Sequence, residues 1–283
     1  MKPAPFELHR PDTLEQALAL LAEYNFDARV IAGGQSLMPL MNLRMVGFSH
    51  LIDLNRITGL AGIRLEKEFI HIGALTRQQD LFNHPVIVKN APLVSAALPY
   101  IGHIQTRNRG TVGGSLAHAD PSAELPLTMV TLDATFIIMS HTGSRKIAAR
   151  KFFTDVLSTD LTSDEILTEI LIPVAPAGAK VCFHEFGRRH GDFAMAACAA
   201  QYVAHPEGNK LTVGLGGVDA RPYFCEELSR LMSAGNGALP KLDQHIENEL
   251  KKLNPLSDLQ ADAAYRRTLA AVLLADCLQE VLQ

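Results

Sequence analysis

Apolar side chains in the first part of the chain switch between helical and extended spacing. Residues 14–21 carry Leu and Ala at helical spacing directly after Thr13, a residue type that caps helix N-termini. Residues 28–32 and 51–54 are short apolar runs, and the first of them ends abruptly at a pair of glycines. The pattern predicts one surface helix and two buried strands, of which the first leads into a glycine turn.

Between residues 63 and 102 the pattern predicts a hairpin followed by helices. Residues 63–73 alternate as in two paired strands. Thr76 is placed to cap a second helix whose exposed polar face carries residues 78–80, and residues 85–102 return to helical spacing.

Further strands are predicted before a break in the chain. Residues 127–139 are rich in strand-forming residue types and precede a turn at 140–144, and residues 166–172 form another apolar run. Residues 173–178 read Pro-Val-Ala-Pro-Ala-Gly, the most linker-like stretch of the sequence. We therefore expect a domain boundary at this point.

The last third of the sequence predicts strands and then helices. Residues 193–203 and 210–218 are the strand candidates, and the Leu- and Ala-rich tail from about Glu226 to Gln283 is predicted to be helical. The chain as a whole is therefore of the α+β class.

Composition and charge exclude several kinds of partner. The chain has 283 residues, of which 47% are hydrophobic and 20% charged, with a formal net charge of -4. This charge offers no field that attracts nucleic acid or an anionic membrane. The first ten residues lack the apolar run of a signal peptide, and no stretch reaches the about 18 apolar residues that span a bilayer. We expect a cytoplasmic protein with no nucleic-acid partner and no transmembrane segment.

No metal site is predicted in this chain. The four cysteines are widely spaced and form no C-x-x-C pair: Cys182, Cys198, Cys225 and Cys277. Four small buried thiols are the simplest interpretation. His118 and Asp120 lack a third ligand, so hydrogen bonding within a loop is preferred to metal binding.

Two glycine pairs flanked by hydroxyl side chains are candidates for anion binding: Ala32-Gly33-Gly34-Gln35-Ser36-Leu37 and Thr111-Val112-Gly113-Gly114-Ser115-Leu116. Glycine permits positive φ and lets backbone N–H groups approach a ligand without Cβ obstruction. Most glycine pairs are plain turns, but two of this kind suit a ligand with two adjacent phosphates. Neither motif is a P-loop or a G-x-G-x-x-G fingerprint. A third pair, Gly216-Gly217, has no hydroxyl beside it and is interpreted as structural.

The second motif continues as Ala117-His118-Ala119-Asp120-Pro121-Ser122-Ala123-Glu124. Together the two motifs resemble the FAD motifs of the flavin, or medium, subunits of molybdenum hydroxylases, the carbon monoxide dehydrogenase and xanthine dehydrogenase family. The resemblance runs nearly end to end and includes Lys2 to Phe6, Asn42-Leu43-Arg44, Ile52-Asp53-Leu54, Gly73-Ala74-Leu75-Thr76, Glu165 to Pro173 and Gly187 to Ala194.

This resemblance implies the fold and the domain organisation. Residues 1–176 would form a two-subdomain FAD-binding domain of the vanillyl-alcohol-oxidase (PCMH) type, divided into about 1–58 and 59–176. Residues 177–283 would form a C-terminal α+β domain with an antiparallel sheet and helices.

The resemblance also implies an oxidoreductase complex. The chain would be the FAD subunit of a heterotrimer with a large molybdopterin subunit and a small subunit that carries two [2Fe-2S] clusters. Substrate would be oxidised at molybdenum, and the clusters would pass electrons to FAD and then to an external electron acceptor. No catalytic residue is assigned in this chain.

The family's FAD contacts transfer to this sequence position by position. Those around the diphosphate are Val30, Ile31, Ala32, Gly33, Gly34, Gln35, Ser36, Leu37, Thr111, Val112, Gly113, Gly114 and Ser115. Glu124 is expected near the sugar–phosphate side, and Ile101, Leu167 and His184 at further FAD contacts. Phe193 stands where carbon monoxide enzymes have Tyr beside the isoalloxazine ring, which keeps an aromatic face but removes a hydroxyl.

Gln35 implies that FAD binds noncovalently, because relatives with covalent flavin have His at this position. At this residue the chain is more similar to hydroxylases of nitrogen heterocycles than to the carbon monoxide enzymes. Two alternatives stay open beside the main hypothesis. One is a self-contained FAD-dependent oxidase of the same fold, which needs a substrate pocket with a base. The other is a flavin-free assembly subunit, which the intact glycines and hydroxyls disfavour.

Arg107 and Arg109 precede the second motif. Their position is compatible with pairing to a phosphate, and equally with a solvated or interfacial role.

Overall fold

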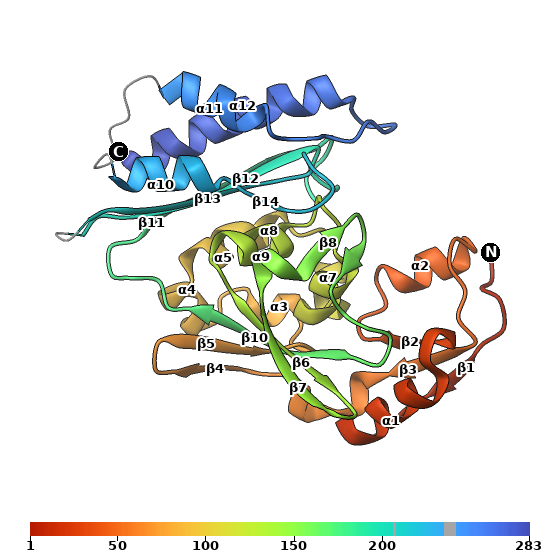
Figure 1. The fold of residues 1–283 in the computed structure, drawn as a ribbon. Helices are drawn as coiled ribbons and strands as arrows, with labels where there is room; N and C mark the ends of the chain where they lie inside the picture. Colours follow the sequence, from red (N-terminus) through yellow and green to blue (C-terminus); the bar gives the residue numbers. More distant parts are fainter. Residues whose placement is uncertain (206–207, 235–241) are drawn as a thin grey trace.

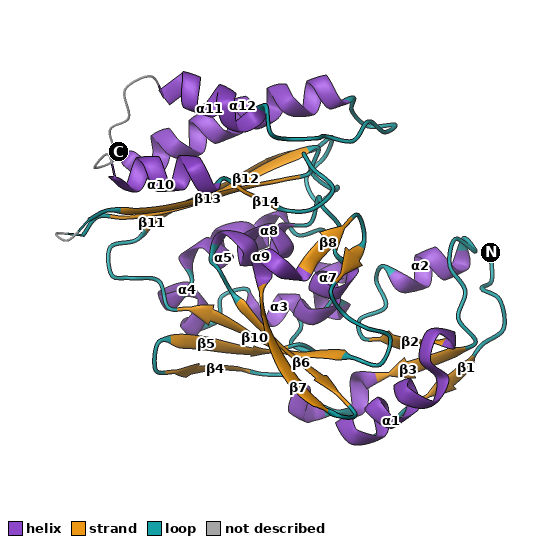
Figure 2. Ribbon diagram, viewed as in Figure 1, coloured by secondary structure: helices purple, strands orange, loops and turns teal. Residues whose placement is uncertain are grey.

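Three structural units follow one another along the chain (Figures 1 and 2). The structure is a computed structural model and describes residues 1–205, 208–234 and 242–283. The N-terminal unit lies to one side of a central unit, and the C-terminal sheet with its helices lies on top of the central unit.

The N-terminal unit is a small parallel sheet with a helix packed on it. Its strands pair in the order β1–β3–β2. The hydroxyl of Thr13 accepts a hydrogen bond from the Gln16 N–H, which confirms the predicted helix cap, and the apolar stripe of the helix packs on β2 and β3. The elements are β1 (Glu7–His9), α1 (Leu14–Tyr24), β2 (Ala28–Ile31), α2 (Leu37–Asn42) and β3 (His50–Asp53).

The central unit is built on a five-stranded antiparallel sheet with the order β4–β5–β10–β6–β7. The predicted hairpin at residues 63–73 is confirmed as β4 and β5. The strands are β4 (Ile63–Glu66), β5 (Phe69–Gly73), β6 (Thr135–Ser140), β7 (Gly143–Ala148), β8 (Phe153–Asp155), β9 (Ser158–Thr159) and β10 (Ile166–Pro173). The helices are α3 (Gln78–Leu81), α4 (Pro85–Asn90), α5 (Pro92–Ala97), α6 (Ile104–Arg109), α7 (Val112–His118), α8 (Glu124–Thr131) and α9 (Ala149–Phe152).

The first half of the strand predicted for residues 127–139 is wrong, because these residues belong to helix α8. All of its residues are buried, so it has no polar face that could reveal a helical period. Thr128 and Thr131 satisfy their hydroxyls inside the helix by donating to the carbonyls of Glu124 and Leu127, at 2.7 and 2.9 Å. A buried helix rich in Thr, Val and Leu has the composition of a buried strand, which explains the wrong prediction.

Thr76 does not cap a helix, contrary to the prediction. Its buried hydroxyl accepts from the Gly62 N–H at 2.9 Å and donates to the Gly62 carbonyl at 3.0 Å, while α3 begins after Arg77. Gln78, predicted to be exposed, is buried, and its Oε1 would lie 2.5 Å from a Cβ placed on Gly110. This segment is therefore part of the core beneath the second glycine motif.

The C-terminal unit is a four-stranded antiparallel sheet with the order β11–β12–β13–β14. Its elements are β11 (Lys180–Phe186), β12 (Ala196–Val203), β13 (Lys210–Gly216), β14 (Tyr223–Phe224), α10 (Glu226–Ala234), α11 (Leu242–Leu250) and α12 (Ala263–Leu282). The predicted strands at 193–203 and 210–218 are confirmed as β12 and β13, whereas β11 was not predicted. The helical tail is confirmed for α10, α11 and α12, and its residues 235–241 lie outside the described part.

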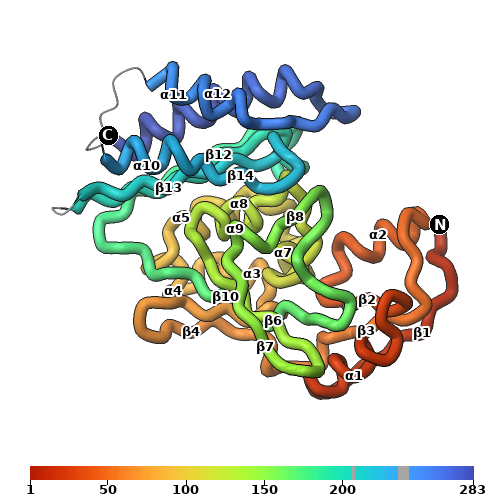
Figure 3. The backbone as a smooth tube through the Cα atoms, viewed as in Figure 1, coloured from red at the N-terminus to blue at the C-terminus, as the bar shows by residue number. Residues whose placement is uncertain are grey.

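Helices cover both faces of the C-terminal sheet. Helices α10 and α12 pack on one face, and α5 and α8 of the central unit pack on the other. Gly214 and Gly216 of β13 permit this close approach, because a Cβ at either would lie 3.1 or 3.2 Å from the side chain of Leu127. The structural interpretation of Gly216 is thereby confirmed. Figure 3 shows the chain leaving the central sheet after β10 and entering β11.

Buried apolar side chains form three clusters. The largest joins the central unit to the inner face of β11 and β12, the second lies between the C-terminal sheet and its helices, and the third joins the N-terminal unit to Leu75 and Ile166 of the central unit. All four cysteines are buried, as predicted. None of the helices in the described part of the chain is both long and apolar enough to cross a bilayer.

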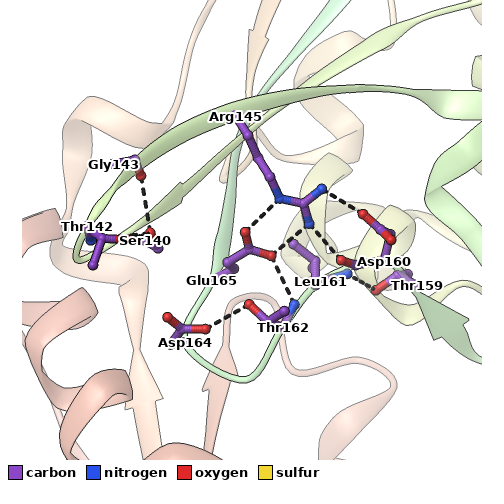
Figure 4. A network of polar contacts seen from close by, with 10 residues as sticks. All are labelled: Ser140, Thr142, Gly143, Arg145, Thr159, Asp160, Leu161, Thr162, Asp164 and Glu165. Atoms are coloured by element: carbon purple, nitrogen blue, oxygen red, sulfur yellow. Dashed lines mark hydrogen bonds and ion pairs between the residues drawn. The ribbon is translucent and has the colours of Figure 1, made fainter.

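Arg145 connects the β6–β7 hairpin to the loop before β10 through hydrogen bonds and ion pairs (Figure 4). Its guanidinium donates to both carboxylate oxygens of Glu165, at 2.7 and 2.8 Å, and to Asp160 at 2.6 Å. The Thr162 N–H adds a hydrogen bond to Glu165 at 2.9 Å. The Arg145 guanidinium holds the pKa of Glu165 below its usual range. The loop is therefore fixed to the sheet by a charged network.

Candidate functional site

The first glycine motif is a tight turn between β2 and α2. Gly34 has φ of 70°, and Gln35 Nε2 donates to the Gly33 carbonyl across the turn at 3.1 Å. Within the described residues, the backbone N–H groups of residues 33–37 donate to no protein acceptor, and the Ser36 hydroxyl has no hydrogen-bond partner. Successive unpaired N–H groups form the concave donor surface that binds phosphate and other anions.

The second glycine motif is the start of a helix, not a second turn of the same kind. Thr111 caps α7, and its Oγ1 accepts from the Gly114 N–H at 3.1 Å. The N–H groups of Val112 and Gly113 donate to carbonyls of the segment 74–76, at 3.0 and 2.8 Å. These three N–H groups are used inside the protein. The expectation of two equivalent phosphate nests is therefore corrected to one nest beside a helix N-terminus.

The two motifs are packed against each other. A Cβ on Gly33 would lie 2.2 Å from the Arg109 carbonyl oxygen and 2.9 Å from the Gly110 Cα, so only glycine fits there. A Cβ on Gly114, which is exposed, would lie 2.6 Å from Thr111 Oγ1 of the helix cap and 3.9 Å from the Ala32 Cβ of the first motif. The open sides of both motifs therefore face the same space.

Asn55 and Arg77 connect the motifs through backbone carbonyls. Asn55 Nδ2 donates to the Ala32 carbonyl at 2.8 Å, and Arg77 Nη2 donates to Asn55 Oδ1 at 2.7 Å. Arg77 Nη1 donates to the Arg109 carbonyl at 2.5 Å. Sequence reasoning missed both residues, because their acceptors are 23 and 32 positions away and no local pattern marks such contacts.

Arg107 supports the chain between the motifs and Ile101. Its Nη1 donates to the carbonyls of Ile101 and Gly102, at 2.8 and 3.1 Å, and its guanidinium lies over the Phe82 ring. In this structure Arg107 therefore positions the backbone around Ile101 and Gly102. The roles considered from the sequence, pairing with a phosphate or a solvated or interfacial position, stay predictions.

Phe193 lies in a loop that packs beside Ile101. A Cβ on Gly191 would lie 3.1 Å from the Gly102 carbonyl oxygen, so the loop touches the residue next to the buried Ile101. Phe193 itself is 52% exposed. It lines an open pocket with Arg188, Arg189, Gly191, Asp192 and Gln260. The structure thus places the Phe193 loop beside Ile101, so two predicted FAD contacts that are distant in the sequence lie in one region. The Phe193 ring stays accessible.

Glu124 is a buried carboxyl at the first position of α8. Burial raises its pKa to about 7. Glu185 of β11 is a neighbour that sequence reasoning missed: burial, and then the charge of Glu124, raise its pKa to about 8. Among the described residues Glu185 Oε2 is buried and has no hydrogen-bond partner. Near neutral pH a pKa of about 7 leaves Glu124 partly protonated, and a pKa of about 8 leaves Glu185 mostly protonated. In the protonated form each carboxyl can donate a hydrogen bond to a ligand.

Leu167 and His184, the two remaining predicted FAD contacts, lie in different parts of the structure. Leu167 is a buried side chain of β10 in the central core. His184 faces the C-terminal helices, with its Nε2 3.2 Å from Glu280 Oε2 of α12, whereas the preceding Phe183 packs in the central core on the other face of β11. The FAD contact expected for His184 stays a prediction, and this orientation counts against it.

This geometry describes a protein that binds a phosphate-containing ligand between two glycine motifs, and comparison with known families identifies the ligand class. Residues 4–175 match the family described as FAD binding domain in molybdopterin dehydrogenase. Residues 181–281 match the CO dehydrogenase flavoprotein C-terminal domain. The chain belongs to the FAD-binding medium subunits of the molybdenum hydroxylase family, and it is therefore a subunit of an oxidoreductase.

Relatives cover the whole length of the chain. It is 37% identical to the 6-hydroxypseudooxynicotine dehydrogenase complex subunit alpha of Paenarthrobacter nicotinovorans, over 100% of this chain and 96% of the relative. The structure of carbon monoxide dehydrogenase from Hydrogenophaga pseudoflava superimposes with a TM-score of 0.95 at 33% identity, covering 99% of this chain and 98% of that one. Quinoline 2-oxidoreductase from Pseudomonas putida 86 gives a TM-score of 0.91 at 32% identity, with coverages of 100% and 99%.

The residues of this chain fit FAD. The unpaired N–H groups of residues 33–37 offer donors to a diphosphate, and Gly114, which has no side chain of its own, is exposed beside them. The hydroxyl of the partly buried Ser115, which has no protein partner among the described residues, is a further potential donor.

Proposed function

We propose that this chain transfers electrons from the [2Fe-2S] clusters of a small partner subunit, through its FAD, to an external acceptor. Substrate hydroxylation takes place in a large molybdopterin subunit of the same heterotrimer. The proposal is supported by family membership and by relatives named as medium chains or complex subunits. The observation that carries it is the run of free N–H donors at residues 33–37 held against the second glycine motif.

The protein's own part in this function is to bind and orient the cofactor. When bound, FAD supplies the redox chemistry, because it exchanges electrons with both one-electron and two-electron partners. Residues 33–37 hold the diphosphate, and Thr111 to Ser115 complete the opposite wall. Glu124, in its protonated form, would donate to the sugar–phosphate side, and the accessible Phe193 ring would offer an aromatic face to the isoalloxazine.

Noncovalent attachment and the domain division are part of the same proposal. Gln35 is an amide whose Nε2 already bonds within its own loop, and an amide nitrogen is not a nucleophile that could join the flavin ring. The proposed FAD-binding domain is residues 1–176 and the C-terminal domain is residues 177–283; the separate family matches at 4–175 and 181–281 support this division.

The first test is the near-ultraviolet and visible absorbance of the purified full chain, before and after acid precipitation. We expect flavin bands whose chromophore passes into the supernatant. A colourless chain that takes up no added FAD contradicts the proposal and favours the assembly-subunit alternative. Chromophore that stays in the precipitate contradicts noncovalent binding only.

The second test separates electron transfer from FAD binding. In the purified complex, Gly34→Val and Gly114→Val should lose FAD and reduction of the external acceptor together, while the molybdenum and iron contents stay unchanged. Gly59→Ala is the control, because a Cβ at Gly59 meets nothing within 4 Å. Substrate turnover by the isolated chain would instead support the self-contained oxidase.

A further inference from the structure

Four side chains with metal-binding chemistry meet between β11 and α12. They are Cys182 and His184 on the strand and Cys277 and Glu280 on the helix. The two sulfur atoms are 2.9 Å apart, and Cys182 Sγ lies 3.5 Å from Glu280 Oε2. His184 Nε2 is 3.2 Å from the same carboxylate oxygen. The donor atoms of the two cysteines and the histidine all lie within 4.8 Å of one another.

Secondary structure explains why these residues converge. Residues two apart on a strand point to the same face, and residues three apart on a helix lie on the same side. Cys182 and His184 therefore both face α12, and Cys277 and Glu280 both face β11. The two cysteines are 95 positions apart in the sequence, so no spacing motif could have revealed the pair.

We propose that these four residues bind a zinc ion that joins α12 to β11. Two thiolates, one imidazole and one carboxylate form a complete tetrahedral zinc coordination shell. The ligand atoms of such a shell are separated by about 3.3–3.8 Å, given zinc–ligand distances of about 2.0–2.3 Å. The Cys182–Glu280 separation of 3.5 Å lies within this range, and the His184–Glu280 separation of 3.2 Å lies just below it. The sulfur atoms, 2.9 Å apart, need to move apart by about 1 Å to reach it.

Burial and charge agree with a divalent cation. Both cysteines are buried, whereas the side chains of His184 and Glu280 are 36% and 55% exposed, so one side of the cluster is open to an entering ion. Among the described residues, no Lys or Arg forms a hydrogen bond or ion pair with any of the four.

A second group of potential ligands, Glu7, His9 and His50, fits a metal less well. The two imidazoles are hydrogen-bonded to each other at 3.0 Å, and the Glu7 carboxylate lies 3.8–3.9 Å from them. Within residues 1–205, 208–234 and 242–283 this group has no thiolate and no fourth ligand. It serves as the control for the assignment of the bound ion.

The test measures zinc per chain in the purified full chain by mass spectrometry, before and after incubation with one equivalent of Zn²⁺ and gel filtration. We expect one zinc per chain. Zinc-edge X-ray absorption should show two sulfur ligands at about 2.3 Å and nitrogen or oxygen ligands at about 2.0–2.1 Å. A chain that retains no zinc after this incubation overturns the proposal.

Variants assign the ion to these residues. Zinc content should fall at least about tenfold in Cys277→Ser, and in His184→Gln and Glu280→Gln the ion should be lost faster to a chelator. Cys225→Ser, at another buried cysteine, and His50→Gln should keep the zinc of the parent chain. If Cys277→Ser fails to fold, His184→Gln and Glu280→Gln still test the proposal, because both side chains are partly exposed.

Two other outcomes overturn the proposal. Retention of zinc in Cys277→Ser together with its loss in His50→Gln places the ion at the second group. Titration that finds two thiols instead of four in the denatured, metal-free chain, purified without reductant, identifies a Cys182–Cys277 disulfide instead. FAD content, measured on the same samples, is independent of both results and reports separately on the proposed flavin function.

Discussion

Gly33 lies directly against the carbonyl oxygen of Arg109, so the first glycine motif rests on the chain that leads into the second. A Cβ on Gly33 would come within 2.2 Å of that oxygen, whereas one on Gly34 would meet side chains at 3.4 Å. The requirement for glycine at position 33 is therefore one of space, and at position 34 one of conformation, because Gly34 has φ of 70°.

Gly33→Ala should separate the two motifs. We expect the affinity for FAD to fall at least about tenfold and the free energy of unfolding of the flavin-free chain to fall by about 1–3 kcal/mol, because backbone must move to admit the methyl group. Equilibrium dialysis with FAD and urea unfolding measure the two effects. Gly59→Ala is the control, and unchanged affinity in Gly33→Ala would show that the contact between motifs is not needed for binding.

Asn55 and Arg77 should act as a unit. Asn55→Ala and Arg77→Lys each break the chain of hydrogen bonds between the Ala32 and Arg109 carbonyls. Lysine keeps the positive charge of Arg77 but cannot donate to two acceptors in the planar geometry of the guanidinium. We expect each to lower the free energy of unfolding by about 1–2 kcal/mol, and the double variant to cost little more than either one. Strictly additive losses in a double-mutant cycle would contradict a shared role.

Glu165→Gln should destabilise the chain at neutral pH by about 1–3 kcal/mol, because it removes the charge that Arg145 binds. The folded pKa of Glu165 lies below the usual 4.5, so its contribution is present above that pH and is lost as the pH falls through the folded pKa. Unfolding in urea at about pH 7 and about pH 4 should therefore show the difference shrinking in acid. The exposed Glu68→Gln is the control, and a difference that does not depend on pH would refute the charge pairing.

Glu185→Gln should have the opposite pH dependence. Folding raises the pKa of Glu185 from 4.5 to about 8, so between these values the folded chain retains a proton that the unfolded chain has released. The stability of the parent chain therefore falls as pH rises through this window, and glutamine removes this penalty. We expect the variant to be more stable than the parent by about 1–2 kcal/mol at about pH 8, with less difference at about pH 5. Equal effects at both pH values would show that Glu185 titrates normally.

Local patterns predicted the elements that have one buried face and one exposed face. The cap of α1 at Thr13, the strand leading into Gly34 and the hairpin at residues 63–73 are all confirmed. Helix α8 was missed because it is buried on all sides and shows no helical period. Thr76 was misassigned because its hydroxyl bonds to Gly62, a partner that only the folded chain brings near.

The candidate site also contains residues that local sequence patterns predicted and residues that they did not. The glycine motifs are visible in the sequence because their chemistry is contained in six consecutive residues. Asn55, Arg77 and Glu185 have no local signal, since their partners come from distant segments. The pair Cys182 and Cys277 is the extreme case, because a strand and the last helix of the chain must pack before the two sulfur atoms meet.

Helix α8 packs on the C-terminal sheet through β12 and β13 and on the central-unit helices α5 and α7, and it begins at Glu124, where the extended second motif ends. The central unit and the C-terminal sheet therefore share this buried helix and cannot hinge apart without exposing it to water. Cleavage of the exposed connection between β10 and β11 should leave two fragments that migrate together, and the intact chain should melt in a single step. A subunit built in this way keeps a constant distance between any partner docked on its C-terminal half and the cofactor held by its N-terminal half.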